Sequence, residues 1–73
     1  MIKRMRSDAA AALCARYGFN LPLMLAAMPG RAMSGDTDTH QILVCRYPAT
    51  IAIEISRSED WKTVERFNVG VGA

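Results

Sequence analysis

The feature that constrains the fold most is the segment TIAIEIS at residues 50–56, where isoleucine recurs at every second position. Ile51, Ile53 and Ile55 alternate with smaller or polar residues, and successive side chains of a β-strand point to opposite faces of a sheet. All three are β-branched, a side-chain type that favours strands. The segment therefore predicts a half-buried strand whose isoleucine face is covered by another layer.

A second apolar segment precedes this strand. Residues 41–47, QILVCRY, are typical of a strand that is partly covered on both faces. Residues 47–50, YPAT, predict a short hairpin turn between the two strands, because Pro48 presets the backbone angle that such a turn needs.

Residues 59–69 leave two interpretations open. The preceding sequence SRSE has the spacing of a capping box, which would start a helix here. Alternation instead places Trp61 and Phe67 on one face of a strand, whereas a helix would leave Phe67 off its apolar stripe. We favour the strand, which predicts a three-stranded antiparallel β-meander over residues 40–71.

Two short helices are expected before the sheet. Ser7 is suited to cap the first, residues 7–17, which is rich in alanine and is ended by Gly18. Asn20 is suited to cap the second, residues 21–28, which a Pro-Gly pair ends. These elements predict an α+β fold in which the two helices pack on the isoleucine face of the meander.

The remaining segments complete one small domain. Residues 30–39 are mostly small and polar and are expected to form a loop. Residues 1–6, MIKRMR, precede the first helix and are expected to form a flexible basic arm. Because 73 residues provide only a small core, we assign residues 1–73 to a single domain.

Charge is distributed unevenly along the chain. Residues 1–35 contain five basic residues and one acidic residue, a net charge of +4, whereas residues 36–73 contain four basic and six acidic residues, a net charge of −2. The basic front half is expected to approach an anionic surface. The candidate partner-binding residues are Ile2 and the cations of this half, namely Lys3, Arg4, Arg6, Arg16 and Arg31.

The second predicted helix contains no charged residue. It occupies the place of the DNA-reading helix in a helix-turn-helix protein, but base edges are read by polar side chains. After Asn20 this helix offers only leucine, proline, methionine and alanine. A helix that is apolar on all sides is buried, either in the core or against another protein. Leu23, Met24 and Met28 are therefore candidates for an apolar interface.

The sequence contains no recognisable catalytic or metal-binding set. His40, the single histidine, lies five residues before Cys45, and an odd separation along a strand points two side chains to opposite faces. Cys14 and Cys45 lack the spacing of a metal site or a disulfide framework, so we expect free thiols in a reducing cytoplasm. Charged residues interrupt any targeting or membrane segment near the N-terminus. We expect no enzyme, no metal and no cofactor.

The function that remains is binding. We predict a small cytoplasmic regulator or inhibitor that docks on a larger, locally acidic protein, and a component of the transcription or nucleic-acid machinery fits the basic arm. One alternative is a winged-helix-like nucleic-acid-binding domain. A second is a homo-oligomeric structural subunit that pairs its edge strands.

Overall fold

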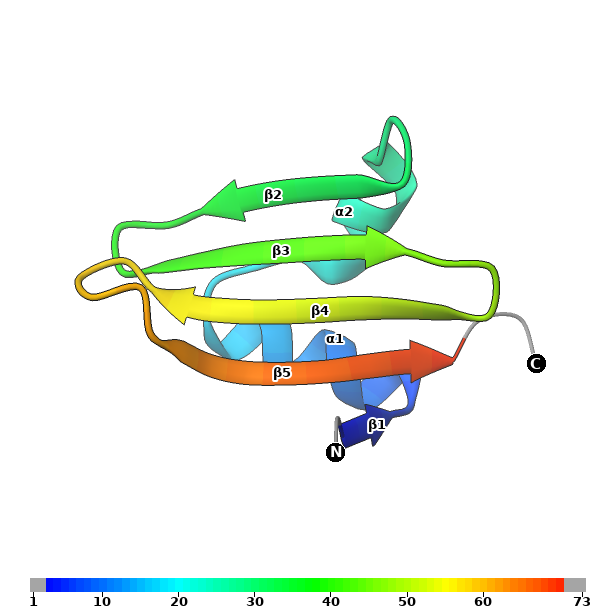
Figure 1. Cartoon of the computed structure of the whole chain (residues 1–73), viewed down its shortest axis with the longest axis horizontal. Helices are drawn as coiled ribbons and strands as arrows, with labels where there is room; N and C mark the ends of the chain where they lie inside the picture. The colour runs from blue at the N-terminus through cyan, green and yellow to red at the C-terminus, as the bar shows by residue number, and fades with distance from the viewer. Residues whose placement is uncertain (1–2, 71–73) are drawn as a thin grey trace.

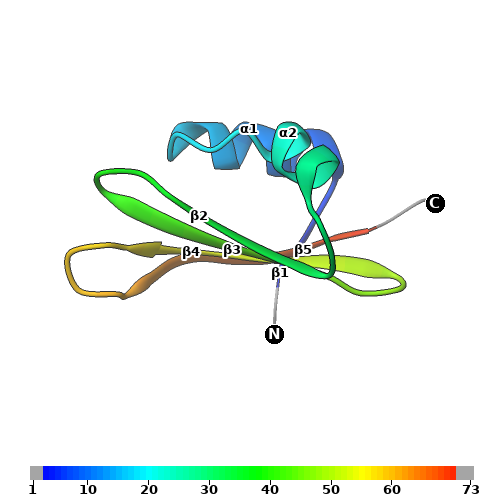
Figure 2. The same cartoon turned by 90° about the horizontal axis from the view of Figure 1, so that it is seen from above.

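The backbone forms a mixed five-stranded sheet with two helices on one face, in the strand order β1-β5-β4-β3-β2 (Figures 1 and 2). The structure is a computed structural model that describes residues 3–70. The elements in chain order are β1 (Lys3–Met5), α1 (Ser7–Arg16), α2 (Leu21–Ala27), β2 (Ala32–Asp36), β3 (His40–Arg46), β4 (Thr50–Arg57) and β5 (Thr63–Gly70). The predicted α+β class is confirmed.

The isoleucine strand occupies the middle of the sheet, as its alternation predicts. In β4, Ile53 pairs with Val44 of β3 on one side and with Phe67 of β5 on the other, both in antiparallel register. The interpretation of the C-terminal segment as a strand is confirmed, but β5 begins only at Thr63. The predicted turn is also present, since the Tyr47 N–H donates to the Thr50 carbonyl at 2.8 Å.

The prediction of a plain loop over residues 30–39 is wrong, because β2 lies within it. Met33 pairs with Val44 and Gly35 with Ile42, so β2 and β3 form an antiparallel hairpin. At its turn, the Thr37 N–H donates to the His40 carbonyl at 2.8 Å. The sequence AMSGD has low strand propensity, but β3 offers it a complete ladder of hydrogen-bonding partners.

The prediction of a flexible arm over residues 1–6 is also wrong for the part that the structure describes. Residues 3–5 form β1, which pairs in parallel with β5 and places Met5 beside Val69. Met5 packs against the core. The sheet therefore has five strands instead of the predicted three, and one of its pairings is parallel.

The helix boundaries agree with the prediction to within one residue, but one predicted cap is wrong. Ser7 lies inside α1, and Arg6 precedes the helix without a capping side-chain hydrogen bond. The Asn20 cap is confirmed, because its Oδ1 accepts from the Leu23 N–H at 3.1 Å. Gly18 follows α1 with a φ of +89°, a left-handed conformation that favours glycine.

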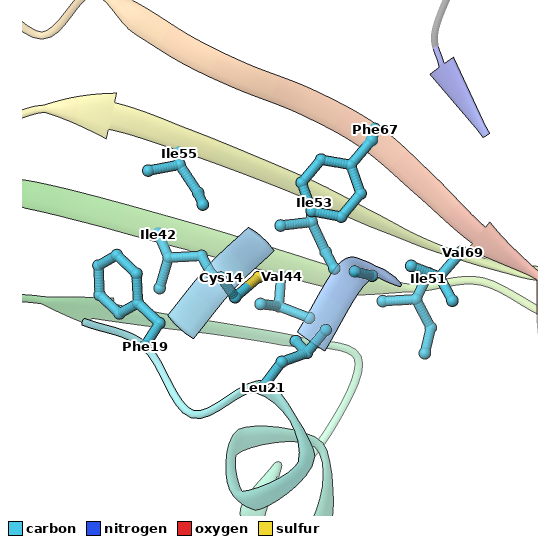
Figure 3. Close-up of a cluster of buried hydrophobic side chains, with 11 residues drawn as sticks. Cys14, Phe19, Leu21, Ile42, Val44, Ile51, Ile53, Ile55, Phe67 and Val69 are labelled. Atoms are coloured by element: carbon cyan, nitrogen blue, oxygen red, sulfur yellow. The ribbon is translucent and has the colours of Figure 1, made fainter. Parts of the chain in front are cut away.

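The core fills the space between the helices and one face of the sheet (Figure 3). Cys14 of α1, Phe19 of the connection and Leu21 of α2 point toward the sheet (Figure 3). The other side of the core comes from alternate residues of three central strands: Ile42, Val44, Ile51, Ile53, Ile55, Phe67 and Val69. The helices cover the isoleucine face, as predicted, and the opposite face of the sheet has no covering layer among the described residues (Figure 2).

Within residues 3–70, neither helix alone has the length and apolar composition to cross a membrane. Together α1 and α2 reach that length and composition, but they are bent by 107° at the break between them.

Candidate functional site

The first edge of the sheet carries several basic side chains, and two of them, Lys3 and Arg16, line the same groove although they are distant in sequence. We call Lys3, Arg4, Arg6 and Arg16 the basic edge. Lys3 and Arg4 come from β1, Arg6 links it to α1, and Arg16 is the last residue of α1. The parallel pairing of β1 with β5 holds this segment beside α1 (Figure 1).

An open groove of about 420 Å³ lies between β1 and α1 at the basic edge. Lys3, Arg16 and Glu65 supply its charged groups. The rest of its lining is apolar, from Met5, Ala9, Ala12 and Leu13. A groove of this composition fits an apolar side chain flanked by carboxylates, because the cations meet the charge and the apolar lining covers the side chain.

The carboxylate in the groove is already engaged by an uncharged donor. Tyr17 Oη donates to Glu65 Oε2 at 2.9 Å, and this hydrogen bond raises the pKa of the tyrosine above its ordinary value. The Tyr17 ring in turn packs edge-on against His40, with 4.8 Å between centroids. Neither Lys3 nor Arg16 lies within ion-pair distance of a described carboxylate. Both cations therefore remain available to an anionic partner.

The two other cations of the basic edge are held differently. Arg4 lies against the end of β5, because a Cβ built on Gly70 would be only 3.1 Å from Arg4 Nη2. Arg6 Nε is 3.6 Å from Asp8 Oδ1, and both side chains are highly exposed. Such an exposed pair contributes at most about 1 kcal/mol, so Arg6 also remains accessible to a partner.

One predicted binding residue, Arg31, does not join the basic edge in the structure. Arg31 precedes β2, which lies at the opposite edge of the sheet from β1. It lines a separate open groove of about 550 Å³ with Ala32 and Tyr47. Ile2 lies outside the described residues.

The predicted apolar interface on α2 is only partly exposed. Leu23 is 63% exposed. Met24 and Met28 are half-buried and pack against the core. Met24 Cε reaches within 3.4 Å of where a Cβ on Gly35 would lie. Of the three residues, Leu23 alone presents most of its side chain to solvent.

Sequence reasoning missed three exposed apolar side chains. Leu43 of β3 is 47% exposed, and Tyr47, in the turn that follows this strand, is 55% exposed. Trp61 is 65% exposed and has a φ of +62° in the turn between β4 and β5. The sequence SED before Trp61, with its turn-forming residues, is the signal that could have placed it in a turn instead of a strand.

The turn that carries Trp61 is held by polar contacts. Arg57 Nη2 donates to Asp60 Oδ2 at 2.6 Å, and the Lys62 N–H donates to Asp60 Oδ1 at 3.1 Å. These donors, the Lys62 amide first, hold the pKa of the Asp60 carboxyl below its ordinary value. The Trp61 N–H donates to the Arg57 carbonyl at 2.8 Å. The contacts account for a left-handed conformation at a bulky residue.

The two cysteines are free thiols, as predicted, and they lie on opposite sides of the sheet. Cys14 is fully buried in the core, and burial raises the pKa of its thiol to about 11. Cys45 pairs with Ala52 on the face that the helices leave uncovered. Among residues 3–70, no group of three or more histidine, cysteine, aspartate or glutamate side chains is arranged to hold a metal ion.

Comparison with known proteins gave no match to a family model, a curated protein or a solved structure.

Proposed function

We propose that this protein is a small non-enzymatic regulator or inhibitor that docks on a locally acidic surface of a larger protein. The observation that carries the proposal is the pair of cations at the basic edge, Lys3 and Arg16, which flank a mostly apolar groove and form no ion pair within residues 3–70. A component of the transcription or nucleic-acid machinery is the class of partner to be screened first.

The composition of the groove favours a protein partner over nucleic acid. A nucleic-acid backbone offers phosphates to the cations but leaves the apolar lining from Met5 to Leu13 uncovered. An acidic protein surface can supply carboxylates and an apolar side chain together. In addition, α2 presents no polar side chain after Asn20 with which to read bases.

The test uses two variants with the same change in net charge. Lys3→Ala/Arg16→Ala removes the cations beside the groove, and Lys62→Ala/Arg66→Ala removes two exposed cations elsewhere. Partners captured from an extract of the native host are identified by mass spectrometry. The affinity of the purified partner is then measured at about 50 mM and about 500 mM salt, since screening weakens exposed charge pairs.

We expect Lys3→Ala/Arg16→Ala to weaken the complex about three- to tenfold at low salt and less at high salt, because each exposed pair contributes roughly 0.2–1 kcal/mol. The control variant should bind like the unmodified protein. Equal affinity of both variants at low salt would refute docking through the basic edge. Steeply salt-dependent binding to a random DNA duplex, lost in the first variant, would favour the nucleic-acid alternative.

A further inference from the structure

The second edge of the sheet, β2, lacks the features that protect β1 from pairing with another strand. Natural edge strands are commonly protected by short length, by lysine or by proline. The three residues of β1 include Lys3 and Arg4. The five residues of β2, AMSGD, contain no cation and no proline, and Ala32, Ser34 and Asp36 are exposed.

The outward side of β2 is free to form hydrogen bonds. Within residues 3–70, β2 pairs only with β3, so the backbone groups on its other side point away from the sheet. Figure 1 shows β2 as the outermost strand on this side, and Figure 2 shows the helices stacked on the face of the sheet. The edge therefore matches the requirement for adding a further strand.

Charge along β2 runs from basic to acidic. Arg31 immediately precedes the strand, Asp36 ends it and Asp38 lies in the following turn. None of the three lies within ion-pair distance of an opposite charge in the part of the chain that the structure describes. A strand with this polarity is complementary to its own antiparallel copy, because the basic end of each strand meets the acidic end of the other.

We propose that β2 pairs antiparallel with β2 of a second copy of this chain, which joins the two sheets into one continuous sheet. A two-fold axis at Ser34 places Ala32 opposite the second copy's Asp36 and Met33 opposite the second copy's Gly35. Arg31 then lies opposite the second copy's Thr37, at the end of the seam that carries the second copy's Asp36 and Asp38. Because side chains alternate along a strand, the guanidinium and the Asp36 carboxylate lie on opposite faces, so they attract each other across the end of the seam without direct contact. The two-fold axis repeats this arrangement at the other end.

Packing on the helix side is compatible with this register. Met33 faces the second copy's Gly35, which has no side chain to clash with it. The methyl group of Met24 borders that glycine in each copy, at 3.4 Å from where a Cβ would lie. Flexible thioethers therefore meet across the seam, and such side chains adapt readily to one another.

Pairing of one five-residue strand with its copy buries less surface than a standard stable interface. We therefore expect a reversible dimer with a Kd of about 10–500 µM. The proposal is independent of docking through the basic edge, because β1 lies at the opposite edge of the sheet and remains free in the dimer.

The experiment is sedimentation equilibrium of the whole chain from about 10 µM to about 1 mM, a range that brackets this Kd. Ser34→Lys places a cation at the centre of the seam and should shift the protein to the monomer. The control is Ala15→Lys, which adds the same charge at an exposed position of α1, the helix that contacts β5 at the other side of the sheet. This variant should have a dimer Kd within about twofold of that of the unmodified protein.

Charge reversal tests the antiparallel register, even if Ser34→Lys affects folding. Arg31→Asp and Asp36→Arg should each weaken the dimer about three- to fivefold at low salt, because like charges then lie at the same end of the seam. The double variant restores opposite charges and should return the Kd to within about twofold of the original. A monomer at 1 mM, or a dimer that is unaffected by Ser34→Lys, would overturn the proposal. So would a double variant no tighter than either single variant.

Discussion

The two edges of the sheet are built by opposite means. β1 is a short, charged strand that a distant part of the chain, β5, holds in parallel register, and its Met5 side chain packs against the core. β2 is longer, carries small side chains and pairs with β3, the next strand in sequence. β1 depends on tertiary packing and exposes charge, whereas β2 depends on a local hairpin and exposes backbone.

This difference shows that the partner an edge strand can bind depends on which of its groups remain accessible to solvent. At β1 the accessible groups are the ammonium and guanidinium groups of Lys3 and Arg16 beside an apolar groove. At β2 they are unpaired backbone groups bordered by opposite charges. The first suits an acidic surface of another protein, and the second suits an identical strand.

The largest expected effect comes from a substitution that unfolds the whole sheet and so abolishes both edge strands. Ile53→Asp places a carboxylate on the buried face of β4, the strand that joins the two halves of the sheet. An unpaired buried charge costs more than about 4 kcal/mol, close to the whole stability of so small a domain. The variant should be unfolded, and its circular dichroism spectrum should lack the helix and strand signals of the unmodified protein.

The control for this variant is the next residue along the same strand. Glu54→Gln keeps an acceptor for the Thr63 hydroxyl and loses only the exposed ion pair with Arg66. It should change the free energy of unfolding by less than about 1 kcal/mol. Similar melting curves for the two variants would mean that the alternation of β4 has been assigned to the wrong faces.

A pH titration compares the two faces of the sheet through the thiol that lies on each, Cys14 of α1 in the core and Cys45 of β3 on the uncovered face. Burial raises the pKa of Cys14 from its ordinary value of 9.0 to about 11, whereas Cys45, next to β2, is half-buried. Because the unfolded chain releases the Cys14 proton at lower pH than the folded protein does, this contribution is complete below about pH 8.5 and is lost as the pH rises to about 11. Its size is at most about 2.7 kcal/mol.

Denaturant unfolding between pH 8 and pH 11 measures this loss. Stability should fall less steeply in Cys14→Ala than in Cys45→Ala, although Cys14→Ala starts lower because it leaves a small cavity. Tyr17 has a raised pKa too and contributes a similar alkaline loss to both variants, so the difference between them reports on Cys14. Equal slopes would mean that the Cys14 thiol is not buried in solution.

The smallest expected effects come from replacing methionine by alanine in each edge strand, which compares the two edges directly. Met5→Ala should lower the free energy of unfolding by about 1–2 kcal/mol, because this half-buried side chain packs against the core. Met33 is also half-buried but is not part of that cluster, so Met33→Ala should cost less than about 1 kcal/mol. A larger loss at Met33 would reverse the distinction between the two edges. Both values are obtained at concentrations below the proposed dimer range.

The elements that sequence predicts well are those specified by local pattern. Alternating isoleucines locate β4. Phe67 and Val69 lie two residues apart and are both buried, and this spacing predicts that β5 is a strand. Asn20 and Gly18 mark helix ends through hydrogen bonds and backbone angles that neighbouring residues determine. These features need no knowledge of the rest of the fold.

The elements that sequence misses depend on distant partners. β1 is a three-residue strand with two cations, and only its pairing with β5 makes it regular. The residues of β2 favour turns, and β3 provides the ladder that overrides this preference. The same limit applies to the candidate site. Charge counting selects Lys3, Arg16 and Arg31 together, but the strand order separates Arg31 from the other two.

The position of β5 has a consequence for how the protein is made. β5 is the last described strand along the chain, yet it lies inside the sheet between β1 and β4. A ribosome releases β1 long before β5, so the pairing of Lys3 with Phe67 can form only when most of the chain has emerged. Until then the basic segment has no strand beside it, and the order of synthesis delays completion of the groove until the sheet is nearly finished.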